Sequence, residues 1–185
     1  MKRSLLLPIL VLALLVPAAA AVAGLPKPAD PVVAPPTSLA GLKLGMAEGK
    51  ALSAWGGASR ATCSVTGETK RCFFGLSGPK GNAIVEFRNH KLSTVAVYAG
   101  RGDESKLLTT AAKPIMEMKT KSGIGIGSSF AKVKAAYPKG KQAGEPGDFS
   151  FSWVLAGKGQ SSFSFELAGD SQKLIAMVLT DGLPG

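Results

Sequence analysis

Hydrophobic and polar residues alternate in several short runs of the second half of the chain. In "FSFSWVL" (149–155) an apolar side chain stands at every second position, and "SFSFEL" (162–167) repeats this pattern. Alternation with a period of two predicts strands with one buried and one solvated face. The run "LIAMVL" (174–179) is apolar throughout and predicts a strand in the middle of a sheet.

A short helix is expected before these strands. Phe130, Val133 and Tyr137 recur at a spacing that places them on one helical face, and Ser128 or Ser129 can cap the helix. In the first half, strands are expected over residues 82–88 and 92–98.

The two halves of the chain resemble each other. Segments align in three pairs: 41–56 with 123–138 and 91–100 with 173–182, both at an offset of 82 residues, and 85–87 with 165–167 at an offset of 80. Two separate blocks that return to one offset indicate that one supersecondary unit occurs twice. In this alignment Gly41 and Gly45 match Gly123 and Gly127, whereas Lys43 matches Gly125. The alignment therefore predicts that Gly125 is dispensable.

These patterns predict an α+β fold made of two tandem repeats. Repeat 1 covers residues 37–102, repeat 2 covers residues 120–185, and residues 103–119 connect them. Each repeat is expected to pack a short helical segment on an antiparallel sheet of three to four strands.

The N-terminus predicts a secretory signal peptide over residues 1–23. Lys2 and Arg3 precede a nearly unbroken apolar run, and small residues before Gly24 fit a cleavage site. A membrane anchor is disfavoured because the run is shorter than the ~20 residues that span a bilayer. The expected location is secreted, periplasmic or otherwise extracytoplasmic, with no transmembrane segment after removal of the signal.

Residues 24–36, "GLPKPADPVVAPP", hold five prolines in thirteen residues. Such a composition cannot build a core, so we expect a poorly ordered tether and folded sequence only from about Thr37.

Positive charge narrows the choice of partner. The chain has 22 Lys and Arg against 12 Asp and Glu, a net charge of +10. The basic residues are scattered, and few aromatic residues lie among them, so a nucleic-acid groove is not expected. The charge favours solubility or weak attraction to an anionic cell-envelope component.

Cys63 and Cys72 are the only cysteines. In an exported chain, two cysteines so close in sequence predict a disulfide, here across a β-hairpin that turns at Gly67 and Glu68. A redox or metal site would need C-x-x-C spacing or histidine partners, and the only histidine is His90.

Neither a cofactor nor a catalytic or metal site is expected. "GIGIGSS" (123–129) is not a dinucleotide fingerprint, because its sixth position is Ser128, and it lacks the G-K-[ST] of a phosphate-binding loop. His90 lies in "RNHK", which is typical of a solvated hairpin turn. A nucleophile that needs histidine therefore has no clear base.

Two acids occupy equivalent positions in the predicted strands. Glu86 and Glu166 would serve a hydrolase only if they converged in a cleft. The better candidate is a binding face on the side of the sheet opposite the helices, composed of Ser150, Ser152, Ser162, Ser164, Glu166, Glu86 and Arg88.

The tandem pattern is similar to a known fold. A G-L/I-x-L/I-G motif, a short helix that ends at Trp55 or Tyr137 and a meander of strands resemble the β-lactamase-inhibitor-protein-like fold, which also occurs in assembly lipoproteins of the SmpA/BamE type. The resemblance covers roughly residues 37–182. It implies a scaffold that binds proteins or envelope components through its sheet, but no inhibitory-loop residue and no lipobox can be matched.

We therefore expect an exported, non-enzymatic and monomeric binding protein that recognises a protein or an envelope component through its exposed sheet face. The alternatives are a secreted enzyme inhibitor, which would need bulky apolar anchors on a loop or on the sheet, and a hydrolase using Glu86 and Glu166.

Overall fold

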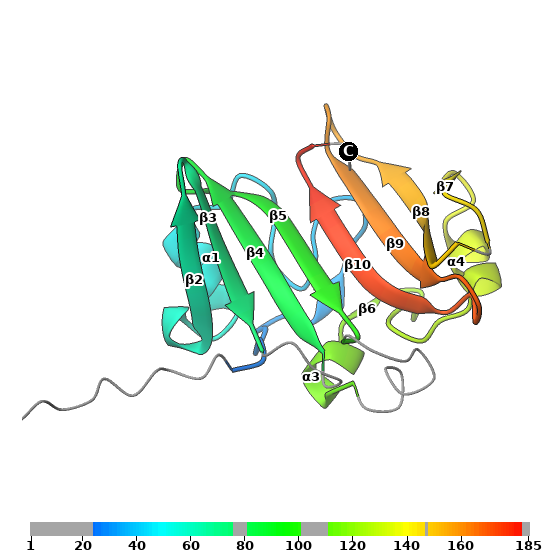
Figure 1. Cartoon of the computed structure of the whole chain (residues 1–185), viewed down its shortest axis with the longest axis horizontal. Coiled ribbons are helices and arrows are strands. Elements are labelled where there is room, and N and C mark those ends of the chain that lie inside the picture. The colour runs from blue at the N-terminus through cyan, green and yellow to red at the C-terminus, as the bar shows by residue number, and fades with distance from the viewer. Residues whose placement is uncertain (1–23, 76–80, 101–110, 147, 183–185) are drawn as a thin grey trace, which may run out of the picture.

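Eight strands form one antiparallel sheet in this computed structural model, which describes residues 24–75, 81–100, 111–146 and 148–182. The predicted signal peptide lies outside the described residues. The strand order is β2-β3-β4-β5-β10-β9-β8-β7 (Figure 1). The strands are β2 (Ala61–Thr66), β3 (Thr69–Phe74), β4 (Asn82–Arg88), β5 (Lys91–Tyr98), β7 (Lys141–Ala143), β8 (Ser150–Ala156), β9 (Ser162–Ala168) and β10 (Leu174–Thr180).

The expected mixed α+β class is confirmed, but the sheets are not separate. β2 to β5 form a first half and β7 to β10 a second half, and β5 pairs with β10 in the middle. The short helices are α1 (Glu48–Ala54), α3 (Lys113–Met116) and α4 (Phe130–Ala136), with a 3₁₀ turn η1 (Ala58–Arg60) before β2. β1 (Val32–Val33) and β6 (Lys119–Thr120) make a separate parallel pair.

The main core lies between the sheet and the helices α1 and α4. Phe130 of α4 packs edge-on against Phe151 and Trp153, with ring centroids 5.1 and 5.6 Å apart. Trp55, at the end of α1, packs edge-on against Phe74 at 5.4 Å. The strand registers place all these contacts on one face of the sheet, and Figure 1 shows α1 behind the first half. Each fully buried side chain of this size contributes about 1.5–3 kcal/mol.

The predicted alternation is confirmed in β8, where Phe151, Trp153 and Leu155 are buried. Phe149 differs, since β8 begins at Ser150 and the Phe149 side chain is 83% exposed. The apolar run of β10 lies between β5 and β9, as its composition predicts.

The disulfide between Cys63 and Cys72 is confirmed. The two residues face each other across the β2–β3 hairpin, whose turn is Gly67 and Glu68. Closing so short a loop stabilises the fold by about 2–3 kcal/mol on the chain-entropy model.

Residues 24–36 are not the loose tether that their prolines predict. Lys27 N–H donates to the Trp55 carbonyl and Ala29 N–H to the Ala54 carbonyl, both at 3.1 Å. Val33 is fully buried and pairs with Thr120 through β1 and β6. Proline has no main-chain N–H group to donate. The prolines here do not prevent ordering, because the hydrogen bonds of the segment are made by its other residues.

The start of each helix is held by the turn before the last strand of its half. Glu48 N–H donates to the His90 carbonyl and Phe130 N–H to the Gln172 carbonyl. The N–H groups of Gly45 and Gly127 likewise donate to the carbonyls of Leu92 and Leu174, near the starts of β5 and β10, at 2.8 Å. Ser129 stands at the N-cap of α4 but makes no capping hydrogen bond with its side chain.

Gly125 is not dispensable, contrary to the alignment. Its φ is ordinary, but a Cβ there would lie 2.8 Å from the Met118 carbonyl oxygen and 2.7 Å from Cγ of Lys119. Close approach of two main-chain segments, rather than a left-handed conformation, therefore requires glycine.

We expect Gly125→Ala to lower the free energy of unfolding by about 1–3 kcal/mol, because the added methyl group meets a main-chain oxygen. Gly49→Ala is the matched control. Gly49 lies inside α1 with open space around its Cβ direction, so alanine there should raise stability by up to about 1 kcal/mol. Denaturant titration measures both. Equal effects of the two substitutions would contradict the steric explanation.

Candidate binding surface

The candidate site is the face of the sheet turned away from α1 and α4, called here the open face. The strand registers arrange its side chains in three rows that cross the strands. The polar row is Ser64, Arg71, Glu86, Thr94, Thr180, Ser162 and Ala156. The apolar stripe is Thr62, Phe73, Ile84, Ala96, Val178, Ser164 and Val154, ending at Lys141. The third row is Asn82, Tyr98, Ala176, Glu166, Ser152 and Ala143.

Four residues of the polar row form two cross-strand pairs. The Arg71 guanidinium forms an ion pair with the Glu86 carboxylate across β3 and β4. Thr94 and Thr180 hydroxyls lie 3.1 Å apart across the β5–β10 junction. These cross-strand pairs fix side chains that would otherwise be free to rotate, so the row is preorganised.

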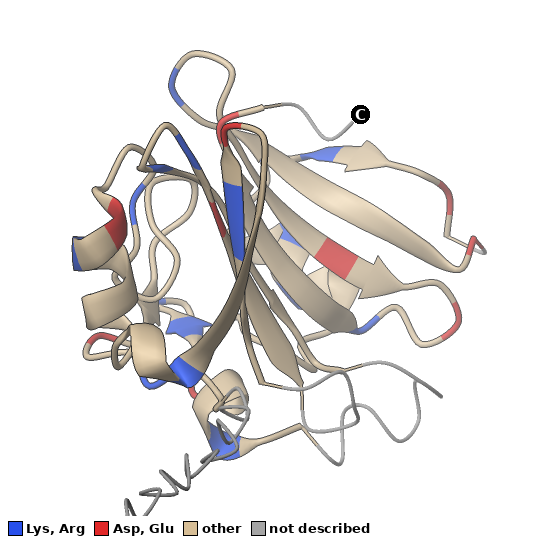
Figure 2. Ribbon diagram, turned by 60° about the vertical axis from the view of Figure 1, so that its left-hand side comes forward, with Lys and Arg blue, Asp and Glu red and all other residues tan. Residues whose placement is uncertain are grey.

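The apolar stripe runs across both halves of the sheet. Phe73 is 36% exposed, while Ile84, Val178 and Val154 are half-buried. Between them Ala96 is only 2% exposed because it is small and stands between larger side chains. Charged residues are few within the strands (Figure 2).

The structure divides the seven predicted binding residues into two groups. Ser162 and Ser164 are buried, at 2% and 7% exposure, and do not present an accessible polar surface. The other five reach solvent to different degrees: Ser150, Ser152, Glu166, Glu86 and Arg88.

The sequence analysis missed the apolar stripe because it expected only polar residues at the strand positions that alternate with the buried ones. The sequence does contain a signal of the stripe. One apolar residue stands in the polar phase of four separate strands, namely Phe73 in β3, Ile84 in β4, Val178 in β10 and Val154 in β8.

Two pockets of about 350 Å³ each lie at the ends of the open face. The first is lined by Ser64, Thr66, Thr69 and Arg71. The second is lined by Lys139, Lys141, Val154, Ala156, Gly159, Gln160, Ser161 and Ser162.

The second pocket combines two features that suit an acidic group with an apolar stem. Neither Lys139 nor Lys141 forms an ion pair with a carboxylate of the described residues, and Val154 and Ala156 add apolar surface. The Ser162 hydroxyl, which also lines this pocket, is buried and has no hydrogen-bond partner among the described residues. A buried donor without a partner costs about 1–3 kcal/mol, which a bound acceptor would recover.

Glu86 and Glu166 do not converge. They stand three strand steps apart, or about 14 Å, and a further four residues apart along the strands, or about 13 Å. Glu86 pairs with Arg71, and Glu166 accepts a hydrogen bond of 3.1 Å from Ser150. Pairs that cleave glycosides lie within about 10 Å.

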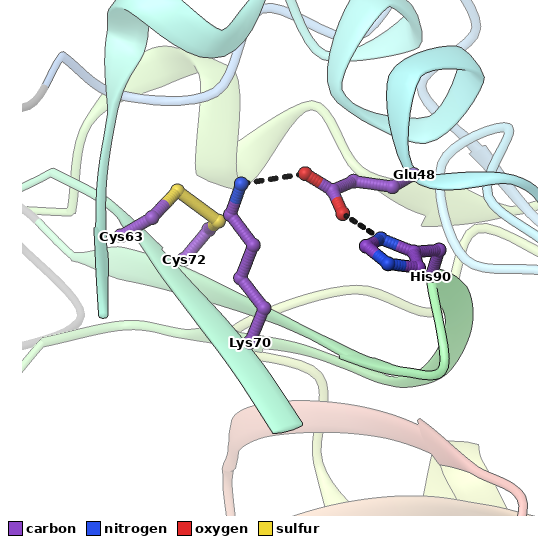
Figure 3. The surroundings of a disulfide bond; sticks show 5 residues. All are labelled: Glu48, Cys63, Lys70, Cys72 and His90. Carbon is purple, nitrogen blue, oxygen red and sulfur yellow. Dashed lines mark hydrogen bonds and ion pairs between the residues drawn. A yellow bond between two sulfur atoms is a disulfide. The ribbon is translucent and has the colours of Figure 1, made fainter. Parts of the chain in front are cut away.

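The densest titratable cluster lies on the helix side of the sheet (Figure 3). The Glu48 carboxylate contacts Lys70 Nζ at 2.6 Å and His90 Nδ1 at 3.3 Å. His90 is confirmed as a turn residue, with its side chain 91% exposed. The cluster ties the start of α1 to β3 and to the β4–β5 turn. Among the described residues, no group of three or more His, Cys, Asp or Glu could hold a metal ion.

The hydrogen bond from Lys70 lowers the pKa of the Glu48 carboxyl below its ordinary value. Burial opposes this lowering, and the contact with His90 reinforces it. A carboxyl whose pKa is lowered on folding stabilises the fold above its unfolded pKa, and this stability is lost as the pH falls through the folded pKa.

Three solved structures show low similarity to this chain. An extracellular protein containing a SCP domain from Bacillus anthracis str. Ames is 11% identical, with a TM-score of 0.46 over 75% of this chain and 44% of that one. The DUF4309 family protein YjgB from Bacillus subtilis subsp. subtilis str. 168 is 15% identical, with a TM-score of 0.39 over 76% and 82%. A cysteine-rich secretory protein (SAV1118) from Staphylococcus aureus subsp. aureus Mu50 is 13% identical, with a TM-score of 0.40 over 85% and 48%.

No protein-family model matches the sequence, and no curated protein matches it either. The chain spans less than half the length of the Bacillus anthracis protein. The expected resemblance to β-lactamase-inhibitor-protein-like proteins stays a prediction. Within the described ranges, no helix is long and apolar enough to cross a membrane. Function therefore has to be inferred from the residues of this chain.

We expect Glu48→Gln to lower the free energy of unfolding by up to about 1 kcal/mol at neutral pH, because it removes the charge that pairs with Lys70. The difference from the unchanged protein should shrink as the pH falls below the unfolded-state pKa of glutamate, about 4.3, and through the lowered pKa of the folded Glu48 carboxyl. Urea unfolding at several pH values measures this difference.

Glu117→Gln is the control, since Glu117 pairs with Lys113 on the surface at 3.6 Å and is 56% exposed. Its effect should be smaller at every pH. A Glu48→Gln effect that stays constant down to pH 3 would show that charge is not its cause.

Proposed function

We propose that this chain is an exported, non-enzymatic binding protein that recognises a protein or a cell-envelope component through its open face. The apolar stripe is the observation that carries the proposal. It places partly exposed apolar side chains on four strands of the sheet, β3, β4, β10 and β8, although both halves already have a buried core.

A partner that covers the stripe would bind most strongly where the stripe exposes the most apolar surface, because burying that surface is favourable. Phe73 and Ile84 are neighbours across β3 and β4, and the Arg71–Glu86 pair lies beside them in the polar row. A partly exposed apolar centre with a polar border is the usual anatomy of a protein-recognition surface. Aromatic anchors such as Phe73 contribute most of the affinity in such surfaces.

The partner is expected to carry acidic groups. The chain has a net charge of +10, and Lys139 and Lys141 stand beside the second pocket without a carboxylate partner among the described residues. An acidic side chain or another anionic group could occupy this pocket while an apolar surface covers the stripe. Charge would then orient the partner, and apolar contact would hold it.

The open face is also proposed to be built from two copies of one unit. Supporting observations recur 82 residues apart: the bounds of α1 and α4, the bridges of Ala47 with Lys91 and of Ser129 with Lys173, and the hydrogen bonds at the helix starts. In such an arrangement each copy supplies four strands, and the stripe is complete only where the two copies meet.

The inhibitor alternative is favoured by one observation. Phe149 is a bulky apolar residue that is 83% exposed just before β8. Its carbonyl accepts a hydrogen bond from Gly169 N–H at 3.1 Å, so the main chain beneath the ring is held in place. A preorganised aromatic residue that projects from a loop is a suitable anchor for the active-site cleft of an enzyme.

Paired substitutions separate the two functions. We expect the chain from Gly24 onward to capture a partner from envelope extract, and Phe73→Ser to weaken the binding of that partner about 10-fold or more. Phe149→Ser removes an equally large aromatic side chain away from the open face, and should leave this affinity unchanged.

Affinities are measured by titration with the captured partner, after circular dichroism has shown that both variants are folded. Loss of binding in Phe149→Ser alone would refute the open-face proposal and support the inhibitor. Unchanged binding in both variants would refute both functions.

A further inference from the structure

The two edges of the sheet differ in how they are protected. β7 at one edge has three residues, includes Lys141, and follows Pro138 and Lys139 closely. β2 at the other edge has six residues, "ATCSVT", with no charged residue and no proline. Its register with β3 is regular over its whole length, without a bulge. Proteins usually protect exposed edges with charge, proline or bulges, and β2 has none of these.

The main chain of β2 presents hydrogen-bonding groups at this edge. The Cα atoms of Cys63 and Cys72 lie 4.0 Å apart, which identifies a non-hydrogen-bonded pair of the antiparallel ladder. The main-chain N–H and C=O groups of Cys63 therefore point away from β3. Because the direction alternates along a strand, those of Val65 point the same way. A two-residue turn after Thr66 agrees with this assignment.

The edge is exposed and held rigid. Every residue from 62 to 66 is exposed, and Val65 is exposed to 69%. The disulfide attaches this exposed strand to Cys72, which is fully buried. A rigid edge loses little conformational entropy when another strand pairs with it.

The cationic side chains next to β2 all have partners within the chain. Lys70 pairs with Glu48 at 2.6 Å, and Arg71 pairs with Glu86. The nearby Arg60 donates two hydrogen bonds to the Leu25 carbonyl. The chain is strongly basic as a whole, but β2 itself carries no charge, and of the three cations beside it only Arg60 has no carboxylate partner among the described residues.

From these observations we infer that β2 pairs antiparallel with β2 of a second copy, so that the two sheets become continuous across a two-fold axis. We place the two-fold axis at Cys63. Cys63 of one copy then forms a hydrogen-bonded pair with Cys63 of the other, and Val65 stands opposite Ala61 of the other copy. On the open face, Thr62 then stands opposite Ser64, a pairing of hydroxyl side chains that antiparallel sheets favour. An acidic extended peptide is the less fitting occupant, since Lys70 and Arg71 already pair with carboxylates and the Arg60 guanidinium donates to the Leu25 carbonyl.

The pairing uses a single strand, so the interface is small and the dimer forms at high concentration only. Sedimentation equilibrium of the chain from Gly24 onward, from about 10 μM to about 1 mM, should show a monomer–dimer equilibrium. Over the same range, hydrogen exchange of the Cys63 and Val65 amides should slow about 10-fold or more. Thr62 and Ser64 amides, which face β3, should change less.

Val65→Pro removes a donor at the outer edge and leaves the β2–β3 bonds in place, so it should abolish the dimer. Val65→Thr keeps the donor and should retain it. Val65→Lys adds a charge at the edge without constraining the main chain, so it provides the same test if the proline variant does not fold.

Three results would overturn the inference. The first is a chain that stays monomeric, with exchange at Cys63 and Val65 independent of concentration. The second is a dimer that persists in both Val65→Pro and Val65→Lys, which would place the interface elsewhere. The third is protection of β2 that appears only when an extended peptide is added to a monomeric chain.

Discussion

The antiparallel pairing of β5 with β10 is the interaction on which the rest of the molecule depends. Five residue pairs join these strands, from Ala176 with Tyr98 to Thr180 with Thr94. Each half alone would be a four-stranded sheet with one helix of seven residues, too small to bury a substantial core. The pairing also makes the open face continuous, because Ala96 and Val178 join the two parts of the apolar stripe.

Much of the fold follows from local patterns in the sequence. The period-two runs give β8 and β9, the spacing of Phe130 and Val133 gives α4, and the distance between the cysteines gives the β2–β3 hairpin. The β5–β10 pairing could not be predicted in this way, since a strand pattern shows which face is buried but does not name the neighbouring strand. Contacts with distant parts of the chain also hold residues 24–36 in place, and contact with a neighbouring main-chain segment explains why residue 125 has to be glycine.

The candidate site was only half predictable for a related reason. The correct face follows from alternation, but accessibility depends on the neighbours. Ser162 and Ser164 have the right phase and are buried all the same, whereas Phe73 has an apolar side chain and stays partly exposed. In the account proposed above, the open face binds a partner and the β2 edge binds a second copy of the chain. The two surfaces are compatible because an added strand extends the sheet sideways and leaves its face uncovered.

Native-state hydrogen exchange tests the central claim, that one sheet joined at β5 and β10 is the cooperative unit. The account predicts that amides bonded between β5 and β10 exchange only through global unfolding, with the same free energy as amides inside β4 and β9. Exchange at the β5–β10 junction with a clearly lower free energy than within either half would show that the halves separate while folded. Two independent halves could not maintain a continuous open face, and that result would contradict the account.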